Sequence, residues 1–168
     1  MVVQGLKADG SDSAEISLRL GRAIQLAVEN VKVGGGPFGA LVVRDGTIIG
    51  EGANSVTREC DPTAHAEVVA IRMACKHEQQ FHLDGCVLYT SCEPCPMCLA
   101  TAYWARISKI YYAATAETAA AAGFADAFIY EQFRLPQEER SIAMIQVPHV
   151  DANRAFEDWD RLATKIDY

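Results

Sequence analysis

The chain has 168 residues, the size of a single domain with one substantial core. Half of its residues are hydrophobic, 22% are charged and the net charge is −7; this argues against nucleic acid as a partner, because phosphate-binding proteins show a basic stripe. No apolar run approaches the length of a membrane span, and the N-terminal region lacks a basic-then-apolar secretory pattern. We therefore expect a soluble cytoplasmic protein with no membrane partner, whose six cysteines serve metal binding and packing instead of disulfides.

Helical and strand periodicities alternate along the chain, which we expect to form one domain over 1–168. After a loose N-terminus at 1–12, the expected elements are, in order, a helix at 13–32, strands at 38–44 and 47–52, a helix at 64–78, a strand at 86–90, a helix at 96–105, a strand at 106–114, a short helix at 117–122, a strand at 141–147 and an amphipathic helix at 151–166. The order predicts a three-layer α/β/α fold, with helices on both faces of a mixed sheet of about five strands.

Glycines punctuate the first half of this pattern. Gly34, Gly35 and Gly36 end the first helix, and Asp45-Gly46 predicts a hairpin between the first two strands. The glycine run has two interpretations of equal weight. It is either a flexible helix stop or a place where the backbone approaches a flat ligand closely.

A histidine and a Pro-Cys-x-x-Cys motif form the pattern typical of zinc deaminases. A catalytic zinc site takes three protein ligands and leaves a fourth position for water, and His65, Cys95 and Cys98 supply those three. For each motif the sequence predicts a loop or strand followed by a helix, and Pro94 and Pro96 are well suited to a helix start. Unpaired N–H groups and the helix dipole there favour thiolate over thiol, and the spacing of the two cysteines puts both on one helix face.

Glu67 follows the histidine by two residues and is not needed as a ligand. A carboxylate beside an activated water can take its proton and return it to a substrate nitrogen and then to a leaving amine. The predicted chemistry is hydrolytic deamination of an amidine-like ring carbon. A structural zinc site with Cys92 as fourth ligand is the first alternative, but it leaves Glu67 without a function. A thioredoxin-like redox site is the second, and it uses neither Glu67 nor His65.

The wider chain resembles the guanine deaminases of the cytidine-deaminase fold, from the first helix to the last residue. The resemblance is carried by five stretches of sequence: Gly35-Gly36-Pro37-Phe38-Gly39-Ala40, Asp61-Pro62-Thr63-Ala64-His65-Ala66-Glu67, Tyr89-Thr90-Ser91-Cys92-Glu93-Pro94-Cys95-Pro96-Met97-Cys98, Tyr103-Trp104-Ala105-Arg106 and Ala122-Gly123-Phe124-Ala125-Asp126. It implies a central mixed sheet between helices and one Zn²⁺ per subunit. The zinc motif is common to the superfamily, so the choice of base depends on the Ala-Gly-Phe stretch, the acidic residue after it and the terminal tyrosine.

The resemblance also assigns roles to single residues. It implies that His65, Cys95 and Cys98 are the zinc ligands, that Cys92 is a spectator and that Glu67 is the proton shuttle. It implies that Asn54, which spacing alone assigns to a turn, reads the purine edge together with Asp126, and that Asp126 also helps the leaving amine. The remaining implied substrate-binding residues are Phe38 and Trp104 as stacking walls, Ala66 and Tyr168.

The activity implied is hydrolysis of guanine to xanthine and ammonia. The same chemistry on guanosine, cytosine or a triazine such as ammeline is the nearest alternative, a tRNA adenosine deaminase is less favoured by the acidic charge, and a zinc-stabilised binding module is the alternative that is not an enzyme. The resemblance further implies a homodimer, in which the helix and tail at 150–168 cross to the partner and bring Tyr168 to its site. For Cys60, Cys75 and Cys86 we expect buried packing.

Overall fold

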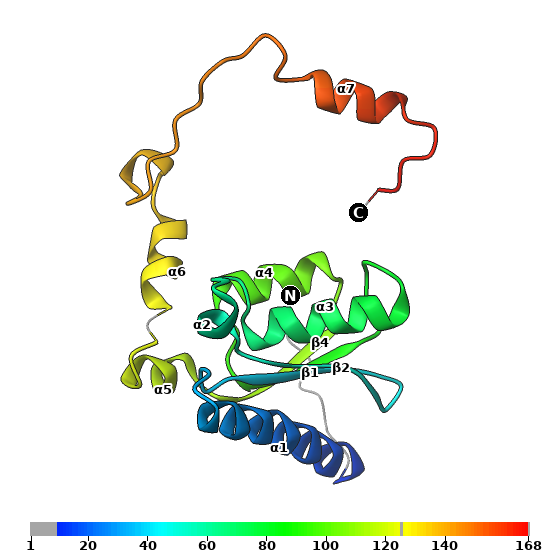
Figure 1. Ribbon diagram of the computed structural model, residues 1–168, viewed down its shortest axis with the longest axis vertical. Coiled ribbons are helices and arrows are strands. Elements are labelled where there is room, and N and C mark those ends of the chain that lie inside the picture. The colour runs from blue at the N-terminus through cyan, green and yellow to red at the C-terminus, as the bar shows by residue number, and fades with distance from the viewer. Residues whose placement is uncertain (1–9, 125, 168) are drawn as a thin grey trace. The chain divides into compact units, whose positions relative to one another are not determined.

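The computed structural model describes residues 10–124 and 126–167 (Figure 1). The chain divides into two compact units, Met1–Asp126 and Ala127–Tyr168, and each is described by itself. The elements of the first unit are α1 (Gly10–Lys32), β1 (Gly39–Arg44), β2 (Thr47–Ala53), α2 (Val56–Glu59), α3 (Ala66–Glu78), β3 (Val87–Cys92), α4 (Pro96–Trp104), β4 (Lys109–Ala114) and α5 (Ala116–Ala121). Helix α1 begins at Gly10, slightly before its predicted start, so the end of the expected loose terminus is helical; residues 1–9 lie outside the described residues.

The four strands form one mixed sheet in the order β2-β1-β3-β4. Strand β1 pairs antiparallel with both β2 and β3, whereas β3 and β4 are parallel. A parallel pair needs a crossover connection, and helix α4 provides it between β3 and β4. The sheet is therefore mixed, as the alternation of elements predicts.

Helices cover both faces of the sheet, with α1 on one side and α3 and α4 on the other (Figure 1). Strand β1 sends alternate side chains into two separate cores. Leu41 and Val43 pack with Ala23 of α1, whereas Ala40 and Val42 pack on the side of α3 and α4. This arrangement confirms the predicted three-layer α/β fold.

Three strand glycines let the helices approach the sheet closely. A Cβ on Gly39 would collide with the backbone of α1 at Ala23, and Cβ atoms on Gly50 and Gly52 would collide with the backbone of α3. Gly39 therefore serves helix packing, whereas Gly34, Gly35 and Gly36 line a cavity of about 660 Å³. Gly34, with a φ of +84°, supports the helix-stop interpretation of the glycine run, and close approach of this backbone to a flat ligand stays a prediction.

The second unit contains α6 (Ala127–Arg134), a 3₁₀ turn (Gln137–Glu139) and α7 (Arg154–Arg161). The strand predicted at 141–147 is wrong: this segment joins no sheet among the described residues, and Ile145 is 81% exposed. Apolar periodicity favours a strand, but a strand forms only where a neighbour accepts its backbone hydrogen bonds. The sheet consequently has four strands instead of about five, and α7 is shorter than the predicted helix at 151–166.

The three cysteines outside the Cys92–Cys98 segment differ in burial. Cys86 is buried and Cys75 is half-buried in the same core, but Cys60 is exposed at the end of α2. Buried packing was therefore the wrong expectation for Cys60, because its left-handed backbone conformation ends a short surface helix.

Among the described helices, none combines the length and the apolar character that crossing a bilayer requires.

Candidate metal centre and active site

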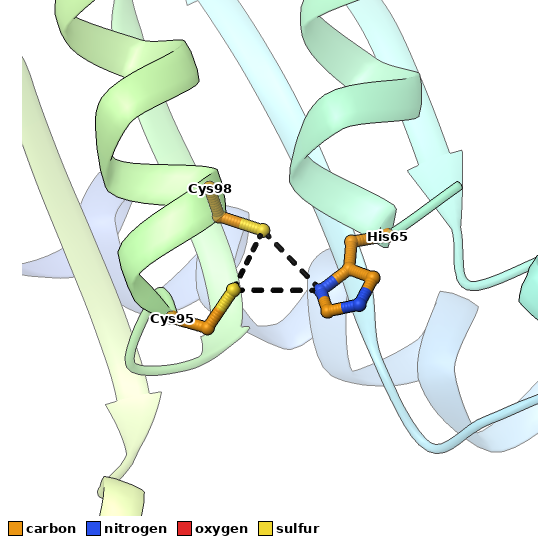
Figure 2. A group of neighbouring side chains, drawn as sticks. All are labelled: His65, Cys95 and Cys98. Atoms are coloured by element: carbon orange, nitrogen blue, oxygen red, sulfur yellow. Dashed lines mark hydrogen bonds between the residues drawn. The ribbon is translucent and has the colours of Figure 1, made fainter. Parts of the chain in front are cut away.

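The three predicted ligands lie at the starts of two neighbouring helices (Figure 2). His65 is the residue before α3, and Cys95 is the residue before α4; both have extended backbone conformations. Pro96 occupies the first helical position of α4, where a missing N–H costs no hydrogen bond, and Cys98 follows in the first turn. The local sequence thus fixes the sulfur pair, and contacts between α3 and α4 bring the imidazole to it.

The spacing of the ligand atoms fits a zinc ion. The two sulfurs are 3.5 Å apart, and His65 Nδ1 lies 3.6 Å from Cys95 Sγ and 3.5 Å from Cys98 Sγ. Tetrahedral zinc with Zn–S of about 2.3 Å and Zn–N of about 2.0–2.1 Å would place two sulfurs about 3.8 Å apart and a sulfur and a nitrogen about 3.6 Å apart. The cluster therefore needs only a few tenths of an ångström of adjustment to hold the metal, and one coordination position stays open.

Protonation of this cluster is unequal between the two sulfurs. The hydrogen bond between the Cys95 and Cys98 sulfurs, aided by His65, lowers the pKa of Cys95 to about 4. The same hydrogen bond and burial raise the pKa of Cys98. Cys95 is therefore the more acidic of the two thiols, and a metal held by both sulfurs would require both to be deprotonated.

Glu67 lies in the first turn of α3 and is almost completely buried, with 4% of its surface exposed. Its carboxylate accepts hydrogen bonds from Cys98 Sγ at 3.3 Å and from Thr90 Oγ1 at 3.4 Å. Burial raises the pKa of the Glu67 carboxyl above its ordinary value. A carboxyl group whose pKa is raised and that lies beside metal ligands is suited to taking up and returning a proton.

The cluster opens into a cavity of about 660 Å³, a size typical of small-molecule sites. Its wall is formed by the end of α1, the glycine loop, α2 and the segment after α5, with the lining residues Val31, Gly34, Gly35, Gly36, Pro37, Phe38, Asn54, Val56, Thr57, His65, Glu67, Cys92, Glu93, Cys95, Ala122, Phe124 and Asp126. The rings of Phe38 and Phe124 meet edge to face, with centroids 4.9 Å apart and planes at 87°. The cavity therefore joins an aromatic corner to the predicted metal ligands.

Two polar residues with predicted roles also line this cavity. Asn54 follows β2 and is 8% exposed; its Oδ1 accepts a hydrogen bond from the Val56 N–H at 3.4 Å. Asp126 lies on the wall beyond Phe124, and its pKa is raised mainly by burial and also by the negative charge of Cys95. The structure thus brings Asn54, Asp126, Phe38 and Glu67 together around one space.

Other predicted residues are not part of the wall. Trp104 ends α4 with 69% of its surface exposed, away from the lining, and Ala66 is fully buried without lining the cavity. Tyr168 lies outside the described residues. Cys92 lines the cavity but donates its thiol hydrogen bond to the Thr115 carbonyl at 3.6 Å, and the metal-ligand cluster of the described residues consists of His65, Cys95 and Cys98 alone.

Sequence reasoning missed three polar residues near the site. Asn30 and Thr90 are buried and hydrogen-bonded to site residues, and Glu93 accepts from the Ala116 N–H at 3.1 Å, which fixes the start of α5. Asn30 left a signal: it interrupts the apolar stripe of α1 that contains Ala23 and Ala27, and a buried amide must have partners. For Thr90 and Glu93 the signal was only adjacency to the cysteine motif.

Comparison with known proteins defines the family. Residues 15–114 match the model of the cytidine and deoxycytidylate deaminase zinc-binding region, and this range includes His65, Cys95 and Cys98. The chain belongs to the cytidine and deoxycytidylate deaminase family. Within this deaminase family it is similar to a guanine deaminase of Bacillus subtilis (strain 168), with 54% identity over 150 residues, which cover 89% of this chain and 96% of the relative. The predicted resemblance to guanine deaminases of this family is confirmed.

Solved deaminase structures agree with this assignment. The X-ray structure of guanine deaminase from Bacillus subtilis has a TM-score of 0.88 and 53% identity, over 90% of this chain and 98% of that one. A structure of guanine deaminase from Nitrosomonas europaea has a TM-score of 0.63 and 28% identity, over 75% of this chain and 77% of that one. A tRNA-specific adenosine deaminase of Aquifex aeolicus (strain VF5) is 45% identical, but over only 46% of this chain and 52% of the relative.

Proposed function

We propose that this chain is a zinc-dependent guanine deaminase, which hydrolyses guanine to xanthine and ammonia. The observation that carries the proposal is the Glu67 carboxylate beside the cluster of His65, Cys95 and Cys98, at the wall of a cavity of about 660 Å³. The similarity to guanine deaminases over nearly the whole chain supports guanine as the base.

The metal would be one zinc ion per subunit, held by His65 Nδ1 and the two cysteine sulfurs, and when bound it would supply Lewis acidity that makes a neighbouring water more acidic. Glu67 accepts one proton from the water that attacks C2 of guanine. It returns that proton to the ring nitrogen N3 and carries the second water proton to the leaving amine. A C2–O bond forms and the C2–N2 bond breaks, so that the products are xanthine and ammonia.

The cavity wall orients the base for this attack. Phe38 and Phe124 offer aromatic surface, and stacking of one base on an aromatic side chain contributes about 1–3 kcal/mol. The Asn54 amide and the Asp126 carboxyl provide polar groups for the purine edge. The raised pKa of Asp126 suits it to share a proton with the leaving amine.

A substrate panel tests the proposal. The purified zinc-loaded protein is incubated with guanine, guanosine, cytosine, ammeline and adenosine-containing tRNA, and ammonia and the deaminated product are measured. We expect the highest kcat/KM with guanine and little turnover of the others. Zinc-loaded protein that turns over another member of this panel faster, or none of them, would refute guanine as the substrate.

We further propose that the protein is a cytoplasmic homodimer whose segment 150–168 completes the partner's active site. Phe156 and Ile166 are 72% and 65% exposed, and exposed apolar surface of this kind is typical of an interaction site. Six free thiols suit a reducing compartment.

Mixing two inactive forms tests this exchange. A chain truncated after His149 keeps Glu67, and full-length E67Q keeps the tail; each alone should be inactive. Hybrid dimers should recover turnover, because the tail of one subunit then closes the intact site of the other. Absence of recovery in purified hybrid dimers would refute the exchange.

A further inference from the structure

Asn30 lies at the point where α1 ends beside the cavity. Its backbone carbonyl accepts the Gly35 N–H at 2.9 Å, and the Val31 carbonyl accepts the Gly34 N–H at 3.0 Å. Gly34 has a φ of +84°, so the helix ends in a Schellman motif, for which a residue without a Cβ is favoured. The helix end is therefore fixed in one conformation just before the glycine loop.

The side chain of Asn30 joins this loop to the end of β2. Its amino group donates one hydrogen bond to the Gly36 carbonyl at 2.8 Å and the other to the Asn54 carbonyl at 2.7 Å. Asn30 is 5% exposed, and both protons of this buried amide are satisfied by backbone carbonyls of two residues that line the cavity. Aspartate has the same shape, but its carboxylate can donate to neither carbonyl.

Gly35 and Gly36 leave space that the side chains of Asn30 and Asn54 occupy. A Cβ on Gly35 would overlap the side chain of Asn30, and a Cβ on Gly36 would lie 2.9 Å from Asn54 Oδ1. The backbone N–H of Asn54 also donates to the Phe38 carbonyl at 3.1 Å. Asn54 is thus held through its backbone by Asn30 and Phe38, and its side chain is packed against Gly36.

The Asn54 side chain is left with one unused group. Its Oδ1 accepts from the Val56 N–H, and no protein group within the described ranges accepts a hydrogen bond from its amino group. Asn54 lines the cavity, so this amino group is available to a ring acceptor of a bound purine. The direction of that hydrogen bond depends on where the Asn54 backbone is held.

We propose that Asn30 is a positioning residue for substrate recognition: its amide holds the Asn54 backbone and the Gly36 carbonyl so that the Asn54 side chain meets the purine edge. The inference rests on the proposed function, because it names how the same site reads its base. Asn30 itself does not line the cavity, and it acts through Asn54.

A double-mutant cycle tests this coupling. The kcat/KM for guanine is measured for wild type, N30D, N54A and N30D/N54A, with zinc content and the thermal unfolding midpoint recorded for each. We expect N30D to lower kcat/KM by about 10- to 100-fold, as a small displacement of a recognition group can. In the N54A background N30D should cost less than about 2-fold further, because the group it positions is absent.

The control is Q25E, which makes the same amide-to-acid change on an exposed position of α1 and should leave kcat/KM within about 2-fold of wild type. An equal loss from N30D in both backgrounds, or no loss in either, would overturn the proposal. Should N30D fail to fold, N30A gives an independent test, because it removes both hydrogen-bond donors without introducing a charge. N30A should show the same dependence on Asn54, and a loss that persists in N54A overturns the proposal.

The wild-type rate separates the two levels of inference. An active wild type with no coupling between positions 30 and 54 removes the role of Asn30 and leaves the guanine deaminase proposal intact. A wild type inactive on guanine removes the proposed substrate, and the cycle is then measured with the member of the panel that is turned over.

Discussion

Replacing Glu67 by glutamine separates proton transfer from the architecture of the site. Glutamine has the same shape, and its side-chain oxygen can still accept the hydrogen bond from Thr90 Oγ1, which lies 3.4 Å from the carboxylate. It cannot take up and return a proton at neutral pH. General acid–base catalysis contributes about 10²–10⁴-fold, so we expect kcat to fall by that factor, or about 2.7–5.4 kcal/mol at about 1.36 kcal/mol per decade.

Zinc binding and stability should survive the same substitution. Glu67 is not one of the three clustered ligands, and burial raises its pKa, so the neutral amide removes an unfavourable buried charge. The free energy of unfolding should therefore stay equal or rise slightly. The amino group of the introduced glutamine can donate a hydrogen bond to Cys98 Sγ, which lies 3.3 Å from the Glu67 carboxylate of the wild type.

The assay is steady-state ammonia release from guanine, with zinc measured in the same preparation and unfolding followed by heat. E59Q is the matched control, because Glu59 is an exposed carboxylate on the neighbouring helix α2 and should leave kcat unchanged. A zinc-loaded, folded E67Q protein that keeps kcat within about 5-fold of wild type would refute Glu67 as the proton carrier.

Three further predictions concern the metal, an ion pair and the packing of the sheet. C95S should remove zinc and turnover together, and chelation should lower the unfolding midpoint of wild type, because a ligand at about 100 times its Kd stabilises by about 2.7 kcal/mol; retained zinc and activity would contradict this. E51Q should remove the bidentate pair with Arg22, at 2.7 and 2.9 Å, and cost at most about 1 kcal/mol because both side chains are about a third exposed. The hydrogen bond from Arg22 lowers the pKa of Glu51 below its ordinary value of 4.5. The stabilisation by this ion pair is therefore present above pH 4.5 and is lost as the pH falls through the lowered pKa. A difference in free energy of unfolding between wild type and E51Q that stays constant in acid would contradict this prediction. G52A should destabilise by about 1–3 kcal/mol in denaturant unfolding, because its Cβ would meet the backbone of α3; an unchanged midpoint would contradict that contact.

Local sequence determined the metal ligands and the main elements. His65 and Cys95 each precede a helix, and Pro96 begins one, so short-range signals were enough to orient the ligands toward a helix start. The same holds for the sheet: the continuous apolar run over β1 predicts a short strand that is buried on both faces. These features depend on residues only a few positions apart, where the backbone geometry itself sets which side chains lie together.

Only the tertiary structure decided the features that depend on distant segments. Gly52 is fixed by the approach of α3, and Asn30 finds its two carbonyl partners in the glycine loop and after β2. The segment 141–147 has strand periodicity but joins no neighbouring strand in the described chain, so pairing and not pattern settled its conformation. Periodicity reports which residues can share a face, whereas hydrogen-bond partners and close backbone approach arise only when remote elements pack together.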